Sequence, residues 1–176
     1  MSATLTPTED QTFDALFGYI ARCLGLPDDT PDIVKGFQNL VASPTGSFVV
    51  VSPGILQRQD FGRWEYDPAG MAVTTVTAHN SYSYQLDCYG PEGATRASIL
   101  AAAWRSMWGT TAMRGAAITP LYADAPQHLS IVNSEGQFEA RWMVRLYGQV
   151  NQRVTLPQDY FTAAQLDSIV VADQLP

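Results

Sequence analysis

Two neighbouring residues, Asp87 and Cys88, have side chains that could do chemistry. A cysteine nucleophile needs a nearby base, and the two histidines of the chain are His79 and His128. Polar and apolar residues alternate from Ser81 to Cys88, which predicts a strand with His79 on the face opposite Cys88. His128 is not placed by the sequence. A buried packing thiol is therefore the favoured interpretation of Cys88.

Asp87 is predicted to lie on the polar face of the same strand, and two roles stay open for it. It could oppose Arg141 or Arg145 on a second long strand and form a cross-strand charge pair. It could instead be a catalytic acid. We prefer the charge pair.

No spacing of ligand residues predicts a metal or cofactor site. The histidines and cysteines lack the paired spacing of a zinc site, and the acidic run Asp28, Asp29 and Asp32 lacks the ligand positions and the glycine of a calcium loop. No glycine-rich stretch has a phosphate-binding pattern. We therefore expect no metal, no cofactor and no catalytic residue.

The composition argues against a protein that grips nucleic acid by its backbone. Ten basic residues stand against 17 acidic ones, for a formal net charge of −7, and such a protein needs clustered positive charge. All the basic residues except Lys35 are arginines, which suit fixed contacts between proteins. We expect two reduced thiols, no transmembrane helix and no signal peptide.

The hydrophobic periodicity predicts an α+β fold with two main helices. The first helix is predicted from Pro7 to Leu24, with Thr6 as its N-cap. The second helix would end at Gly109. Its apolar stripe comprises Ile99, Leu100, Ala103, Trp104, Met107 and Trp108.

Two long alternating stretches predict the main strands of a mostly antiparallel sheet, with both helices packed on one face. The expected core positions of these strands are Tyr82, Tyr84, Leu86 and Cys88 on the first, and Phe138, Trp142, Val144 and Leu146 on the second. Shorter strands are expected over residues 48–51 and 55–59. We expect a single domain of residues 1–176, with flexible or arm-like ends at about 1–6 and 158–176 and a short helix near 161–166.

One segment has arginines and aromatic residues without a clear core period. Its residues are Arg58, Phe61, Arg63, Trp64 and Tyr66, in the sequence "RQDFGRWEY". Arginine and aromatic side chains are enriched at the centres of protein interfaces. The segment is either an exposed loop or ribbon tip that contacts a neighbouring subunit or partner, or a loop folded back on its own domain.

A series of short stretches, in this order, resembles the neck terminator proteins of tailed bacteriophages and prophages. The stretches are "LGLP", "KGFQN", "GSFVVVSP", "YQLDCYGP", "AAWRSMWG", "ITPLYADAP", "IVNSEGQFEARWMV" and "VTLPQDY". They span roughly residues 16 to 160, and "QLDCYGP" and "GQFEARW" are the most distinctive.

The resemblance implies a structural protein of the virion with a tail-terminator-like fold, assembled as a ring with a hexamer favoured. Such a ring would join the portal and connector to the tail tube and sheath, and DNA would pass through its lumen without specific binding. The implied location is the neck or tail of the virion, and the host cytoplasm during assembly, with no membrane. The alternative is a small cytoplasmic enzyme with a pocket that the sequence does not reveal.

Overall fold

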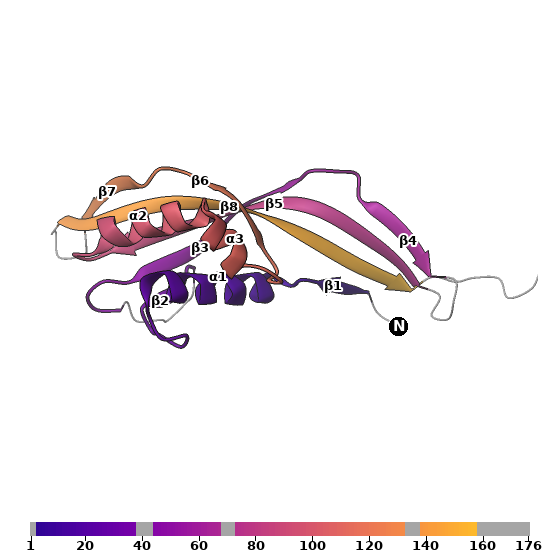
Figure 1. The fold of residues 1–176 in the computed structure, drawn as a ribbon, viewed down its shortest axis with the longest axis horizontal. Helices are drawn as coiled ribbons and strands as arrows, with labels where there is room; N and C mark the ends of the chain where they lie inside the picture. Colours follow the sequence, from indigo (N-terminus) through magenta and orange to yellow (C-terminus); the bar gives the residue numbers. More distant parts are fainter. Residues whose placement is uncertain (1–2, 38–43, 68–72, 133–137, 158–176) are drawn as a thin grey trace, which may run out of the picture.

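The structure of the protein is a computed structural model that describes residues 3–37, 44–67, 73–132 and 138–157. An eight-stranded, mostly antiparallel sheet carries its helices on one face (Figure 1). The α+β class expected from the sequence is therefore confirmed. The predicted short helix near 161–166 and the C-terminal arm fall outside the described residues.

The sheet is organised around two long central strands. These are β5 (Val73–Tyr89) and β8 (Phe138–Pro157), which pair antiparallel from Val73 opposite Pro157 to Tyr89 opposite Arg141 without a shift in register. The other strands are β1 (Thr4–Thr6), β2 (Ile33–Lys35), β3 (Val49–Arg58), β4 (Arg63–Asp67), β6 (Thr119–Ala123) and β7 (Gln127–Val132). Strands β1, β6 and β7 pair with β8, strands β3 and β4 pair with β5, and β2 pairs parallel with β3.

Strand β3 joins two strands that the sequence predicted separately. The Pro-Gly pair at Pro53 and Gly54 was expected to break the chain between residues 48–51 and 55–59. Instead the strand continues past a shift in register between Pro53 and Leu56, opposite β5. A proline without an amide donor is accommodated at such an irregularity, so the strand bends and does not end.

The first helix, α1 (Glu9–Leu24), begins two residues later than predicted. Its N-cap is Thr8, whose hydroxyl accepts a hydrogen bond from the Gln11 amide at 3.3 Å, while the Gln11 side chain accepts from the Thr8 amide at 2.8 Å. This is a capping box. Thr6, the predicted N-cap, is occupied in β1, where it pairs with Arg153 of β8.

The second predicted helix is divided into α2 (Gly93–Trp104) and the short α3 (Met107–Ala112). Gly109 does not end a helix, because Ser106 caps α3 by accepting a hydrogen bond from the Gly109 amide at 3.2 Å. The predicted apolar stripe is therefore interrupted. Leu100 and Trp104 are buried as expected, but the predicted burial of Ile99, Met107 and Trp108 is wrong, since all three are exposed.

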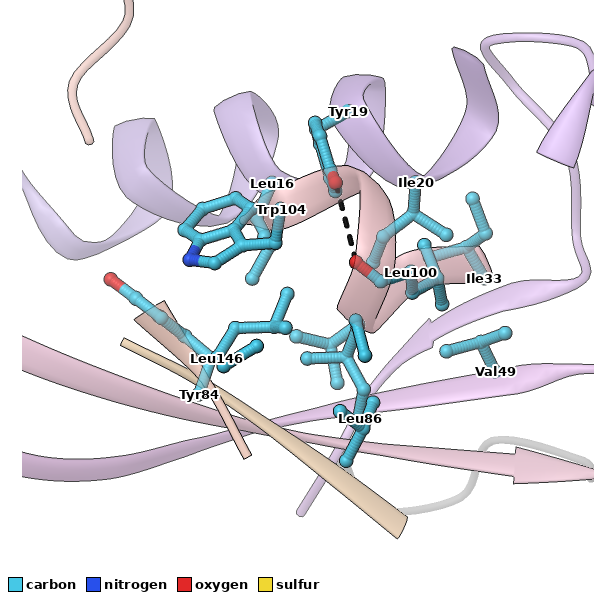
Figure 2. Close-up of a cluster of buried hydrophobic side chains, with 14 of the residues drawn as sticks. Leu16, Tyr19, Ile20, Ile33, Val49, Tyr84, Leu86, Leu100, Trp104 and Leu146 are labelled. Atoms are coloured by element: carbon cyan, nitrogen blue, oxygen red, sulfur yellow. Dashed lines mark hydrogen bonds between the residues drawn. The ribbon is translucent and has the colours of Figure 1, made fainter. Parts of the chain in front are cut away.

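The core lies between the helices and one face of the sheet (Figure 2). Tyr19 of α1 packs edge-on against Trp104 of α2, with 4.9 Å between ring centroids, and its hydroxyl donates to the Leu100 carbonyl at 3.4 Å. Strands β3, β5 and β8 contribute Val49, Val51, Tyr84, Leu86, Cys88, Val144, Leu146 and Val150.

The alternation of β8 was predicted in the correct phase, but its apolar face is only partly covered. Val144 and Leu146 are fully buried, Trp142 is partly buried at the edge of the core, and Phe138 is 82% exposed. The predicted deep burial of Trp142 and Phe138 is therefore wrong. In Figure 1 the first part of β8 lies beside β7 at the left end of the molecule. Both strands reach past the end of α2 there, and no other drawn helix covers them.

Candidate functional site

A four-stranded arm projects from the body of the molecule. We define the arm as β1, β4, residues 73–77 of β5 and residues 153–157 of β8, in the order β4-β5-β8-β1. In Figure 1 the arm extends beyond the helices, and none of the drawn helices covers it. It contains Arg63, Trp64 and Tyr66 of the segment rich in arginine and aromatic residues.

The pairing register gives the arm two unlike faces. Residues directly opposite one another on paired strands share a face. One face carries Thr4, Thr6, Arg63, Glu65, Thr75, Thr77, Arg153 and Thr155. The other carries Leu5, Trp64, Tyr66, Thr74, Val76, Val154 and Leu156. We call this second set the apolar arm face.

Large aromatic side chains on and beside this arm are open to solvent. Trp64 and Tyr66 are 68% and 48% exposed, and Phe61 in the turn before β4 is 97% exposed. Contiguous apolar surface of this kind marks contact sites on soluble proteins. The structure thus places Phe61, Trp64 and Tyr66 at the surface, away from the core of their own domain.

Polar contacts hold the turn that leads into β4. The Asp60 carboxylate accepts from the Gly62 amide at 3.0 Å and from the His79 amide at 3.3 Å, and it also contacts the His79 ring. Hydrogen bonding to His79 lowers the pKa of Asp60 below its usual value. Arg58 donates to the Asp60 carbonyl at 2.6 Å and to the Phe61 carbonyl. Residues 58–67 therefore form a hydrogen-bonded turn followed by strand β4.

The structure places Asp87 and Arg141 in a two-point ion pair on the open face of the sheet. Arg141 Nε and Nη2 donate to the two Asp87 carboxylate oxygens at 2.9 and 2.8 Å, and Gln85 donates to the same carboxylate at 2.9 Å. The hydrogen bonds to Asp87 raise the pKa of Arg141 further above its usual value. Arg145 lies opposite Gln85 and lines the same hollow.

Cys88 and His128 lie on one face of the sheet but do not meet. Both are opposite Trp142 of β8, from β5 on one side and from β7 on the other. They are therefore two strand spacings apart, about 10 Å, with the Trp142 ring against His128. Burial raises the pKa of Cys88 to about 12. Neither histidine is therefore placed to act as a base for this thiol.

We expect Cys88 to resist alkylation in the folded protein. With a pKa near 12, only about one thiol in 10⁴ is ionised at pH 8, and the side chain is fully buried. Iodoacetamide at pH 8, followed by mass spectrometry, should label Cys88 only after denaturation, and half-buried Cys23 serves as the internal comparison. Labelling of native Cys88 at the rate of a free thiol would contradict this assignment.

The described residues contain neither a cluster of metal ligands nor a helix that could span a membrane. Among these residues, no group of three or more His, Cys, Asp or Glu side chains is placed to hold a metal ion. None of the helices in the same residues has both the length and the apolar character to cross a membrane.

Sequence reasoning found part of this arm and missed the rest. The aromatic residues after Arg58 were recognised by type, whereas Leu5, Val76 and Val154 were not. These three come from strands far apart in the sequence, and only the register brings them into line with Trp64. The available signal was the alternation of threonine with leucine and valine in "TLT" and "VTL".

Comparison with known proteins assigns the chain to a family. No curated protein matches the chain. The model of one family, described as phage neck terminator protein, matches residues 10–172. That span includes the body, both central strands and most of the arm. The chain therefore belongs to the phage neck terminator protein family, whose members are structural proteins of the virion.

Proposed function

We propose that this chain forms a ring in the phage neck that joins the portal and connector complex to the tail tube and sheath, with a hexamer favoured. Membership of the neck terminator family supports the location. The observation that carries the proposal is the arm, which projects from the body with Trp64 and Tyr66 exposed. A projection of this kind suits contact with a neighbouring subunit or an adjacent neck protein.

The charge of the chain fits a passage for DNA. With a formal net charge of −7, a ring of identical copies carries a large negative charge. A wall of that sign repels the phosphate backbone, so DNA would slide through the lumen without being held. We place the DNA path in this lumen and infer no specific contact with bases.

The alternative of a small enzyme receives less support from the site. Its pocket was expected around Cys88 and His128, and these two side chains are separated by Trp142. Both carboxylate oxygens of Asp87 accept hydrogen bonds from Arg141 or Gln85, so neither is directed at a substrate as a catalytic acid would be. Among the described residues we therefore assign no catalytic role, and we propose the host cytoplasm only as the place of assembly.

The joining function can be tested in the virus. Infection by a phage that lacks this protein should yield DNA-filled heads and complete tails that are not joined. Adding the purified chain should join heads to tails and restore infectivity. Normal head-to-tail joining in the absence of the chain would exclude the proposed role. Replacing Cys88 by Ser or His128 by Ala should leave joining intact, which separates this role from catalysis.

We expect the double variant Trp64→Ala, Arg63→Ala to lose assembly while it keeps its fold. Truncating an aromatic anchor at an interface costs about 2 kcal/mol or more of binding free energy, whereas both side chains are exposed in the single chain. Circular dichroism and melting temperature should match the wild type, and ring formation or attachment to the neck should be lost. A double variant that still builds functional particles would reduce the segment to an ordinary surface ribbon.

A further inference from the structure

We propose that neighbouring copies join head to tail, with the start of α3 in one copy packing on the apolar arm face of the next. The two surfaces are the apolar arm face defined above and a helical corner formed by Met107 and Trp108. This interface rests on the proposed ring and specifies which surfaces build it. A closed ring of identical chains requires two different, complementary patches on each copy.

The apolar arm face is one continuous surface across four strands. Trp64 lies opposite Val76, Val76 opposite Val154, and Val154 opposite Leu5. A second row runs from the exposed Tyr66 past the buried Thr74 to the partly buried Leu156. Within the described residues these rows lie beyond the helices of the same copy (Figure 1).

The same face of the sheet is covered by helices in the body. Strands β5 and β8 pair without a register shift, so side chains two residues apart stay on one face along their whole length. Val76 therefore shares a face with Tyr84 and Leu86, and Val154 shares one with Leu146, all three of which are buried under α1 and α2. The arm is an extension of the core surface that lacks its helical layer, so a helix is the partner that fits it.

The chain itself supplies an uncovered helical surface. Met107 is 85% exposed and Trp108 is half-exposed, although their spacing is that of a core stripe. The exposed Met107 and Trp108 of one copy can thus supply the helical layer that the apolar arm face of the next copy lacks.

The experiment uses the full chain and two variants, each of which disables one surface. Trp64→Glu places a charge on the apolar arm face, and Met107→Glu places the same charge on the helical corner. Phe138→Glu is the matched control, because Phe138 is equally exposed but lies on neither surface. Masses are measured by native mass spectrometry and sedimentation velocity, with circular dichroism to verify folding.

Wild type and Phe138→Glu should form the ring, whereas Trp64→Glu and Met107→Glu should each remain single chains. An equimolar mixture of the two should give a complex of one copy of each and nothing larger, since only the intact arm of one and the intact corner of the other can meet. Formation of that complex also requires both variants to be folded.

Three results would overturn the interface alone: a ring from Trp64→Glu or from Met107→Glu, a mixture of folded variants that stays as single chains, or loss of the ring in Phe138→Glu. Wild-type chains that stay single at every concentration would contradict the ring itself and this interface with it. The two failures are therefore distinguishable.

Discussion

Replacing Trp104 by Ala is expected to lower the free energy of unfolding by about 3–5 kcal/mol, the usual range for truncating a large aromatic side chain in a core. Trp104 is fully buried, its ring packs edge-on against Tyr19, and its indole N–H donates to the Tyr147 carbonyl at 2.9 Å. The change would remove ring contacts to α1 and leave a buried carbonyl without its donor.

The surroundings of Trp104 have little freedom to close over the lost ring. Gly148 of β8 faces it, and a Cβ at that position would lie 2.4 Å from Ile118 and 3.4 Å from Trp104. The layers are therefore already in close contact, so the cavity would persist and the cost would lie near the upper part of the range.

Urea denaturation at concentrations where the chain is single measures this effect. Trp108→Ala is the matched control, because Trp108 lies in the same helical region but is half-exposed, with its ring 6.0 Å from that of Tyr19, and it should cost clearly less than Trp104→Ala. Equal losses for the two tryptophans would contradict the packing described for the core.

The ion pair between Asp87 and Arg141 should respond asymmetrically to truncation. Arg141→Ala should cost about 3 kcal/mol of unfolding free energy, because it leaves a carboxylate whose side chain is only 6% exposed with a single amide partner. Asp87→Ala should cost less, because the Arg141 side chain is 24% exposed and can reach water. Breaking the pair thus destabilises chiefly through the charge that stays buried.

Arg145→Ala is the control for this series. Arg145 lies on the same face of β8 as Arg141. Its side chain forms no hydrogen bond or ion pair with another described residue. Truncating it should therefore change the free energy of unfolding by about 0.5 kcal/mol or less. Denaturation curves of the three variants rank the effects. An Arg145 effect as large as that of Arg141 would show that general loss of side-chain packing, and not the pair, is responsible.

Much of the fold could be predicted from periodicity alone. Strict alternation in parts of β5 and β8 indicated the face that holds Leu86, Val144 and Leu146, because a period of two is imposed by strand geometry. The helical period likewise predicted α1 and its end at Leu24. Its start was misplaced because two threonines could serve as N-caps, and pairing of β1 with β8 takes the earlier one.

The errors concentrate where apolar residues are not covered by their own chain. Met107, Trp108 and Phe138 have the spacing of core residues, and periodicity alone cannot distinguish a face packed within one chain from a face left for a partner. The same reason hides the apolar arm face, which depends on a register among four strands. The proposed assembly uses Met107, Trp108 and the apolar arm face, whereas it assigns no partner to Phe138.

Electron microscopy of the purified full-length chain tests the central claim most directly. The account predicts closed, annular particles of uniform size with an open centre, each containing a fixed number of copies, and loss of these particles in Trp64→Glu. A field of single chains, or of open filaments without closure, would contradict the proposal that this protein forms the ring of the phage neck.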